Sequence, residues 1–266
     1  MIRLTAPTDP ALWTGPVGSP IITAQLQAQA ASAGGGILRE FWVGDGDGLP
    51  EASSWLCRSG SSLWATVSHP AAAPQAAEFL QLLGGSLVQV DDPIRDCLLR
   101  HRGVRRPILA WAGDAPPACP PAPGLRLQIA PPGDASLAGV IMDLHTQAGE
   151  VPPGERWDTL YAELHLRCRR QAAAGAVLWE GKTAVACGAL GSIGAGDAVV
   201  SHVCTLPRAR RRGLAAQVVT ALCQLSAQLG RRPVLCCREE LLPLYRGVGF
   251  CPTGQGHWII RTGEPL

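Results

Sequence analysis

The chain contains 266 residues, which is enough for one large domain or for two smaller domains of ordinary size. Its formal net charge of +2 at pH 7 gives no overall reason to expect nucleic-acid binding, so any basic function must be local. The first residues lack a basic stretch followed by an apolar core, and no apolar run could span a bilayer, so we expect a soluble cytoplasmic protein without a membrane partner.

The first half of the chain predicts an α/β domain. Its apolar segments are separated by clusters of Gly, Asp, Ser or Pro, which are typical of turns. The predicted helices cover residues 21–33, 74–84 and 94–102, and the predicted strands cover residues 37–43, 53–57, 62–67, 87–90 and 107–111.

A proline-rich segment, residues 113–124, follows this half. It contains five prolines among twelve residues, and neither a helix nor a hydrogen-bonded ladder accommodates such a run. We therefore expect a stiff linker with polyproline II character, which divides the chain into domains at residues 1–112 and 125–266.

The second half predicts another α/β domain, with a mixed (α+β) sheet. Glu180, Gly181 and Lys182 form a turn that joins two strands into a hairpin. The predicted strands cover residues 125–130, 176–179, 183–190, 199–205, 233–237 and 257–261, and the predicted helices cover residues 137–148, 157–171, 214–229 and 241–246.

The most informative stretch is residues 197–230. Val199, Val200 and Val203 are β-branched residues of a buried strand, and Pro207 ends the strand because it has no N–H to donate. Apolar residues then recur at three- and four-residue spacing, which predicts a helix with one apolar face. Arg210–Gly213 lie where the first helical turn leaves its N–H groups without partners, so this turn is a predicted anion site.

Two motifs in this half resemble those of the GCN5-related N-acetyltransferase (GNAT) superfamily. Arg210–Ala215 resembles the R/Q-x-x-G-x-G/A signature, and Val203, Thr205 and Pro207 match the V-x-T-x-P that precedes it. Leu244–Phe250 resembles the family's L-Y-x-x-x-G-F. The resemblance implies the acyl-CoA N-acyltransferase (GNAT) fold for the second domain.

The resemblance also implies a cofactor site. In the family, acetyl-CoA enters a gap beside the central strand, the strand backbone binds the pantetheine arm and the thioester carbonyl, and the loop binds the pyrophosphate. Gly213 would allow a phosphate to approach where a Cβ would not. The implied cofactor-binding residues are Val203, Cys204, Thr205, Arg210, Arg211, Arg212, Gly213, Leu214, Ala215 and Ala216.

One position departs from the family pattern. Seven residues before the tyrosine of the second motif the family often has an asparagine, and this chain has Arg238. The change predicts either an altered thiol end of the site or an additional ligand for a phosphate. Arg238 therefore joins the predicted cofactor-binding residues.

The resemblance gives Tyr245 the role of the acid that protonates the departing CoA thiolate, although a tyrosine packed between helix and sheet is the structural alternative. The base is less clear. His202 lies on the central strand beside the proposed thioester, so it is the second predicted catalytic residue. Other candidates lie on or near the two helices that wall the acceptor pocket in the family: His145, Glu150, Glu155 and His165.

The chain has 10 cysteines, most of them in apolar segments. They form no C-x-x-C pair and have no histidine at ligand spacing, so we expect free thiols in a reducing compartment and no metal site. Cys236 and Cys237 are interpreted as packing residues.

The preferred function is an N-acetyltransferase that moves an acetyl group from acetyl-CoA directly to an amine of an unidentified acceptor, a small molecule or a peptide. One alternative is a non-catalytic acyl-CoA-binding or regulatory module, which would need neither Tyr245 nor a base. Nucleic-acid binding by the arginine cluster is a further alternative, but the cluster lacks interleaved aromatic residues.

The two halves have a similar order of elements. The sequence after Val67 contains neither an arginine cluster nor a glycine at the turn, unlike the stretch after Thr205. The first half is therefore either a degenerate copy of the same fold that lost its cofactor loop or an unrelated α/β domain.

Overall fold

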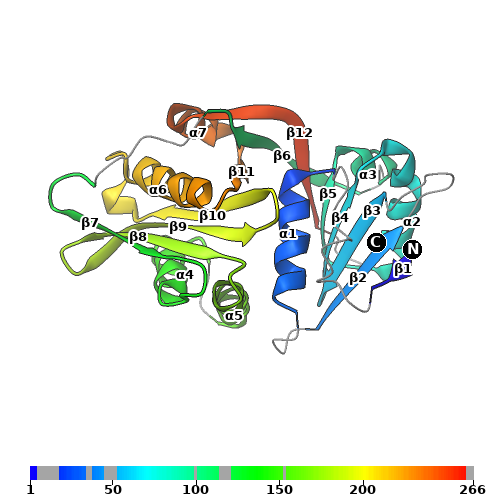
Figure 1. Cartoon of the computed structure of the whole chain (residues 1–266), viewed down its shortest axis with the longest axis horizontal. Helices are drawn as coiled ribbons and strands as arrows, with labels where there is room; N and C mark the ends of the chain where they lie inside the picture. The colour runs from blue at the N-terminus through cyan, green and yellow to red at the C-terminus, as the bar shows by residue number, and fades with distance from the viewer. Residues whose placement is uncertain are drawn as a thin grey trace. The chain divides into compact units, whose positions relative to one another are not determined.

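The computed structural model describes residues 1–4, 18–33, 38–44, 53–98, 101–113, 121–151 and 154–261, without the side chains of residues 155 and 156. The chain divides into two compact units of strands and helices (Figure 1). The first unit comprises Met1–Leu109, Cys236–Glu240 and Pro252–Leu266, and the second comprises Ala110–Leu235 and Leu241–Cys251. Within the described ranges, no helix is long and apolar enough to cross a membrane.

The strands of the first unit follow the order β1-β2-β3-β4-β5-β12-β6. Strands β1 to β4 pair antiparallel, β5 joins β4 in parallel, and β12 pairs antiparallel with β5. A two-residue turn with Gly60 at φ +58° joins β3 to β4. The strands are β1 (Ile2–Arg3), β2 (Arg39–Gly44), β3 (Ser54–Ser59), β4 (Ser62–Val67), β5 (Leu87–Asp91), β6 (Gly103–Trp111) and β12 (Phe250–Arg261).

Two apolar clusters occupy the two faces of this sheet, because successive side chains of a strand point to opposite faces. Leu63 and Ala65 of β4 pack in the cluster that contains Leu80 and Ile94, whereas Trp64 between them packs in the cluster that contains Leu26. The helices that supply these residues are α1 (Pro20–Ala31), α2 (Ala73–Leu83) and α3 (Asp92–Cys97), with a short 3-10 helix at Pro70–Ala72.

A buried carboxylate joins the carboxyl ends of β4 and β5. Asp91 accepts hydrogen bonds from the Thr66 hydroxyl at 2.6 Å and from the Val67 N–H at 3.0 Å. It also accepts one from the Ile94 N–H and caps α3. Burial raises the pKa of Asp91 above its ordinary value.

The strands of the second unit follow the order β11-β10-β9-β8-β7. Neighbouring strands are antiparallel except β10 and β11, which are parallel and connected by a helix. The strands are β7 (Leu125–Ala130), β8 (Ala174–Glu180), β9 (Thr183–Ile193), β10 (Asp197–Thr205) and β11 (Arg232–Cys236).

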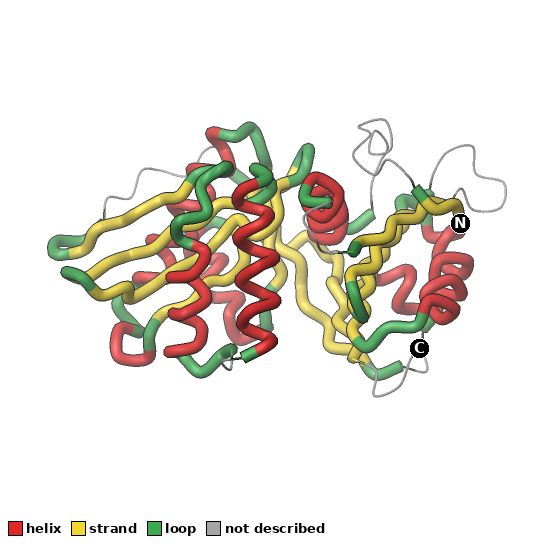
Figure 2. Tube along the Cα trace, turned by 90° about the horizontal axis from the view of Figure 1, so that it is seen from below, coloured by secondary structure: helices red, strands yellow, loops and turns green. Residues whose placement is uncertain are grey.

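Four helices accompany this sheet: α4 (Ala138–Gln147), α5 (Glu155–Arg169), α6 (Leu214–Gln228) and α7 (Leu242–Val248). Helices α4 and α5 lie on one face and α6 on the other (Figure 1), and Figure 2 shows helices lying over the near face of the strands. The apolar side of α6, which includes Val218 and Leu222, is fully buried. The element order of this unit therefore agrees with the sequence prediction.

Three predicted boundaries differ from the structure by four residues or more. The helix predicted over residues 94–102 ends at Cys97, and the strand predicted over residues 107–111 begins at Gly103. The last strand, predicted over residues 257–261, begins at Phe250. Helix ends and strand ends depend on neighbours that local sequence does not show.

The compact units do not divide the chain at a single point. The sequence assigned residues 125–266 to one domain, whereas His257–Arg261 pair with Leu87–Asp91 of β5 and belong to the first unit. Pairing partners of a strand are set by distant segments, so the local pattern could not identify this one. Most of the predicted linker, residues 114–120, lies outside the described residues, and its role stays a prediction.

Candidate functional site

The two parallel strands of the second unit diverge. Strand β10 pairs with β11 at three positions, from Asp197 opposite Arg232 to Val199 opposite Val234. Strand β10 continues to Thr205, so its last six residues extend beyond this ladder. The backbone groups on that edge of β10 are therefore available to a ligand rather than to β11.

A bulge interrupts β10 at the same place. Ser201 lies opposite Ala189 of β9 and Cys204 lies opposite Cys187, so β10 carries one extra residue between these pairs. His202, inside the bulge, has φ +53°. A bulge leaves its extra residue out of the ladder, which turns backbone N–H groups away from β9.

The arginine-glycine loop lies between β10 and α6. Arg211 and Gly213 adopt left-handed conformations, with φ +66° and φ +73°, and Gly213 is the residue before the first turn of α6. The first hydrogen bond of α6 runs from the Gln217 N–H to the Gly213 carbonyl at 3.2 Å. The N–H groups of the preceding residues, Leu214, Ala215 and Ala216, therefore lie ahead of the helical ladder and can bind an anion.

Two arginine side chains of this loop already have partners within the protein. Arg210 donates through Nε to the Thr205 carbonyl at 3.2 Å, which ties the loop to the end of β10. Arg212 forms an ion pair with Glu180 at 2.7 Å, and the hydrogen bond from Arg212 lowers the pKa of Glu180. Both side chains are exposed, so solvent and salt screen this pair. Backbone geometry thus contributes more to the loop than net charge.

Two observations fit an acyl-CoA at this place. A Cβ added to Gly213 would meet no atom of the described residues within 4 Å, so the space over the loop is open. Thr205 Oγ1 is buried and has no hydrogen-bond partner among the described residues. Pyrophosphate over the loop and a polar group of the pantetheine arm beside Thr205 would satisfy both features.

A hydrogen-bonded chain connects helix α4 to the bulge. His145, at the end of α4, bonds through Nδ1 to a carboxylate oxygen of Glu150 at 2.8 Å and through Nε2 to the His202 carbonyl at 3.0 Å. A carbonyl can only accept, so Nε2 carries a proton and Nδ1 faces the carboxylate. His145 is buried, whereas the Glu150 side chain is 45% exposed and reaches solvent.

A glycine turn brings these two residues together. Gly149 has φ +76°, and the chain folds back so that the Glu150 N–H bonds the His145 carbonyl at 2.9 Å. From the sequence, His145 and Glu150 were only separate base candidates. The signal for their pairing was Gly149, two residues after the end of the helix.

His202 has a different environment from the one expected of a base. Its Nδ1 lies 2.8 Å from the Ser201 hydroxyl, and burial together with the charges of His145 and Arg167 lowers its pKa to about 3. The ring is therefore neutral at pH 7 but takes up a proton poorly. The His202 carbonyl, rather than its ring, connects it to the rest of the site.

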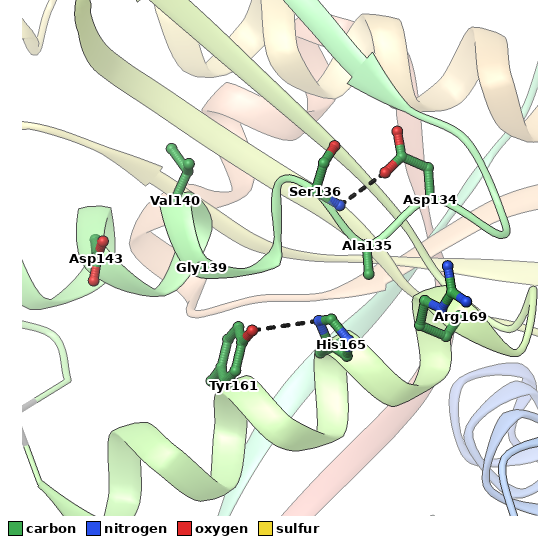
Figure 3. Close-up of a pocket in the computed structure, with 9 residues that line it drawn as sticks. All are labelled: Asp134, Ala135, Ser136, Gly139, Val140, Asp143, Tyr161, His165 and Arg169. Carbon is green, nitrogen blue, oxygen red and sulfur yellow. Dashed lines mark hydrogen bonds between the residues drawn. The ribbon is translucent and has the colours of Figure 1, made fainter.

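A wide, open pocket lies between the start of α4 and the second half of α5 (Figure 3). Its volume is about 620 Å³, and its lining includes Asp134, Asp143, Tyr161 and Arg169. His165, another predicted base candidate, lines this pocket, and its Nδ1 lies 3.4 Å from the Tyr161 hydroxyl. The side chain of the fourth candidate, Glu155, lies outside the described residues.

Tyr245 lies on α7 within the second unit. It is buried and packs edge-to-face against Phe250, with ring centroids 6.1 Å apart. Arg238, by contrast, belongs to the first unit and forms an exposed ion pair with Glu240 at 3.1 Å. The roles assigned to both residues stay predictions.

Two thiols face each other across β9 and β10. Cys187 and Cys204 are directly opposite in the ladder, and a hydrogen bond between their side chains raises the pKa of Cys187 and lowers that of Cys204. From the sequence, Cys204 was expected to offer its backbone to the cofactor and to carry a free buried thiol, with no thiol partner named. Periodicity along one strand could not show which side chains of neighbouring strands meet.

A protein-family model matches the part of the chain that contains β10, the loop and α6. Residues 140–250 match a family model described as the acetyltransferase (GNAT) family. A search of curated protein sequences found no match to the chain.

Solved structures resemble nearly the whole chain. A GCN5-related N-acetyltransferase from Kribbella flavida is 19% identical with a TM-score of 0.59, covering 91% of this chain and 95% of that chain. Another from Sphaerobacter thermophilus is 18% identical with a TM-score of 0.57, at 98% and 90% coverage. A tandem GNAT protein from the clavulanic acid biosynthesis pathway is 13% identical with a TM-score of 0.60, at 99% and 97% coverage.

The second unit is thus an α/β domain in which diverging strands and a bulge lead into an open loop. Its residues 140–250 match the acetyltransferase (GNAT) family model, and the chain shares its fold with solved GNAT structures. The similarity to the tandem protein covers both halves, so the expectation that the first half shares the GNAT fold is confirmed at the level of fold.

Proposed function

We propose that this protein transfers an acetyl group from acetyl-CoA to an amine by direct attack in a ternary complex. The observation that carries the proposal is the edge of β10 beyond its ladder with β11, which leads directly into the left-handed loop at the start of α6. The exposed edge offers backbone groups to the pantetheine arm, and the loop offers N–H groups to the pyrophosphate.

The cofactor contacts follow from this placement. The backbone of Val203–Thr205 would bind the arm and the thioester carbonyl, and the N–H groups of Arg211–Ala216 would bind phosphate oxygens. Arg210 would position the loop through its bond to the Thr205 carbonyl. Arg238 remains a proposed phosphate ligand on the basis of the motif alone.

The reaction begins when the amine nitrogen attacks the thioester carbon. The carbonyl π electrons move to oxygen, and backbone N–H groups of the bulge stabilise the resulting oxyanion. Collapse of the tetrahedral intermediate breaks the C–S bond. Tyr245 donates its phenolic proton to the departing CoA thiolate, and a base takes the proton that the amine nitrogen loses.

Glu150 is the base that the geometry favours. Its carboxylate reaches solvent, where an amine arrives, and is held by His145, which is itself bonded to the bulge through the His202 carbonyl. His202, which the sequence put forward, is a weaker choice because its pKa is lowered to about 3. His145 acts here as a positioning residue for Glu150.

The acceptor is proposed to be a small-molecule or peptide amine. The described cysteines are free thiols, which fits the reducing cytoplasm. The exposed arginine loop is assigned to the cofactor and not to nucleic acid.

Substitution of Tyr245 tests the reaction. Tyr245→Phe should lower kcat by about 10²–10⁴-fold, because a general acid contributes on that scale, while acetyl-CoA still raises the melting temperature as it does for the unmodified protein. The measurements are acetyl transfer to a panel of amines and thermal shift with acetyl-CoA. No thermal shift in the unmodified protein would overturn the cofactor assignment, and full activity of the variant would overturn the acid role.

A further inference from the structure

Three potential metal ligands converge beside the bulge of β10. They are a ring nitrogen of His145, a carboxylate oxygen of Glu150 and Cys204 Sγ, which lie within 4.8 Å of one another. His145 and Cys204 are buried, and Glu150 closes the group on the solvent side. The residues come from the end of α4, the turn after it and β10, so no spacing in the sequence indicated the cluster.

We propose that His145, Glu150 and Cys204 bind a zinc ion, with a water molecule in the fourth position. Imidazole, carboxylate and thiolate are the three ligand types that Zn²⁺ takes in proteins, and three protein ligands with one open position form a common four-coordinate arrangement. Binding releases the thiol proton of Cys204 and the proton shared by His145 and Glu150.

The direction of the His145 ring supports a metal site over a Cys-His-Glu catalytic triad. In such a triad, the thiol and the carboxylate occupy opposite ring nitrogens. Here Glu150 occupies Nδ1, and Nε2 is bonded to the His202 carbonyl rather than to a thiol. A backbone carbonyl at the second nitrogen is the arrangement that fixes a metal-binding histidine, because it leaves the Nδ1 lone pair for the ion.

The ligands need only a small adjustment. Ligand atoms around a tetrahedral zinc lie about 3.3–3.7 Å apart, given zinc–ligand distances of that geometry. The Glu150 side chain is 45% exposed and can rotate, which lengthens its 2.8 Å contact with His145 Nδ1 to this spacing. The same exposure gives an ion access from solvent.

Zinc at this position would inhibit acetyl transfer, and this consequence rests on the proposed function. The ion would occupy the carboxylate oxygen that accepts the amine proton, and it would place positive charge where a cationic amine approaches. Inhibition should weaken when a chelator is added.

Metal titration tests the site directly. Calorimetric titration with ZnCl₂ should show one ion per chain, and Co²⁺ should give a thiolate-to-metal charge-transfer band together with visible bands of a four-coordinate complex. Cys204→Ser should remove the charge-transfer band and weaken zinc binding by more than about tenfold. Cys251→Ser, a matched change at an exposed cysteine outside the cluster, should alter neither.

A second variant protects the test against misfolding. Glu150→Gln changes a side chain at the surface and should weaken zinc binding by more than about tenfold while keeping the charge-transfer band at saturating Co²⁺. A charge-transfer band that survives in Cys204→Ser, or a Glu150→Gln variant with unchanged zinc affinity, overturns the proposal. Zinc binding without acetyl transfer would refute the proposed function alone, and acetyl transfer without zinc binding would refute the metal site alone.

Discussion

Gly213 combines two requirements in one residue. Its φ of +73° favours glycine, and the space where a Cβ would project contains no atom of the chain. Gly230, at the other end of α6, has φ +67° and equally open surroundings. The two glycines therefore share a backbone conformation but differ in whether a phosphate is expected beside them.

Gly213→Ala should lower acetyl-CoA affinity by tenfold or more, since the methyl group occupies space needed for the pyrophosphate. Gly230→Ala carries the same strain, about 1 kcal/mol, without loss of affinity. Isothermal calorimetry gives the affinities, and urea unfolding gives the stabilities. Equal affinity losses in the two variants would mean that strain, not phosphate contact, explains the effect.

His257 should make the stability of the folded protein depend on pH, through its environment in the first unit. Its ring is 1% exposed and bonds Gln89 at 3.0 Å, and burial, together with the charge of Arg106, lowers its pKa from 6.5 to about 4. As the pH falls from about 6.5 to about 4, the unfolded chain takes up a proton on this ring and the folded chain does not. Stability contributed by the neutral ring is therefore present above that range and lost within it.

His257→Gln should keep the contact with Gln89 and remove this dependence. The difference in unfolding free energy between the two proteins should change by up to about 3 kcal/mol between pH 7 and pH 4. Asp91, whose raised pKa acts in the opposite direction, is present in both proteins and cancels in the difference. If urea unfolding showed that the unfolding free energies of the two proteins change with pH in the same way, His257 would not be the source of the pH dependence.

At the scale of elements, α6 packs closely on β9 because Gly188 has no side chain. A Cβ there would lie 2.9 Å from both Val218 Cγ1 and Leu222 Cδ1. The helix begins at the arginine-glycine loop, so its distance from the sheet also sets the position of that loop. Even one added methyl group between α6 and β9 should therefore overpack this contact.

Gly188→Ala should destabilise the protein by about 1–3 kcal/mol through this overpacking. Val218→Ala alone leaves a cavity and also destabilises. The double variant should lose less than the sum of the two, because the smaller residue at 218 accommodates the new methyl group. Denaturant unfolding of the four proteins completes the cycle, and strict additivity would contradict a direct contact.

Elements with a strong local pattern were predictable from sequence. The periodic apolar residues of α6 and the β-branched run in β10 gave both elements, and the glycine after the arginines marked the loop between them. The bulge at His202 was not predictable, because it arises from the register between β9 and β10. The proximity of Cys204 to His145 and Glu150 was not predictable for the same reason. It depends on how the end of α4, the turn after it and β10 pack together.

At the scale of the whole molecule, each unit contains the same connection from a strand through a helix to a parallel strand. The two connections differ at the end of their first strand. Strand β4 leads through α2 to parallel β5, as β10 leads through α6 to parallel β11. In the second unit the end of β10 extends beyond the ladder, whereas in the first unit the Asp91 carboxylate bonds Thr66 and Val67 at the end of β4. An acidic group thus occupies the position that corresponds to the one proposed for the thioester arm.

The chain should therefore bind one acetyl-CoA and not two. Calorimetric titration should give a stoichiometry of one, because the Asp91 carboxyl group fills the corresponding place in the first unit and bonds the end of β4 there. Gly213→Val should abolish binding entirely, since only the second unit carries the loop. A stoichiometry of two, or a residual site in that variant, would show that the first unit retains a cofactor site.

The pairing of β12 with β5 also has a consequence for biosynthesis. Residues 257–261 are made long after the strand beside which they lie, which is completed at residue 91. Domains usually fold as units during synthesis, beginning at the N-terminus. Here the unit that starts first on the ribosome cannot finish its sheet until residues 110–235 of the second unit have also been made.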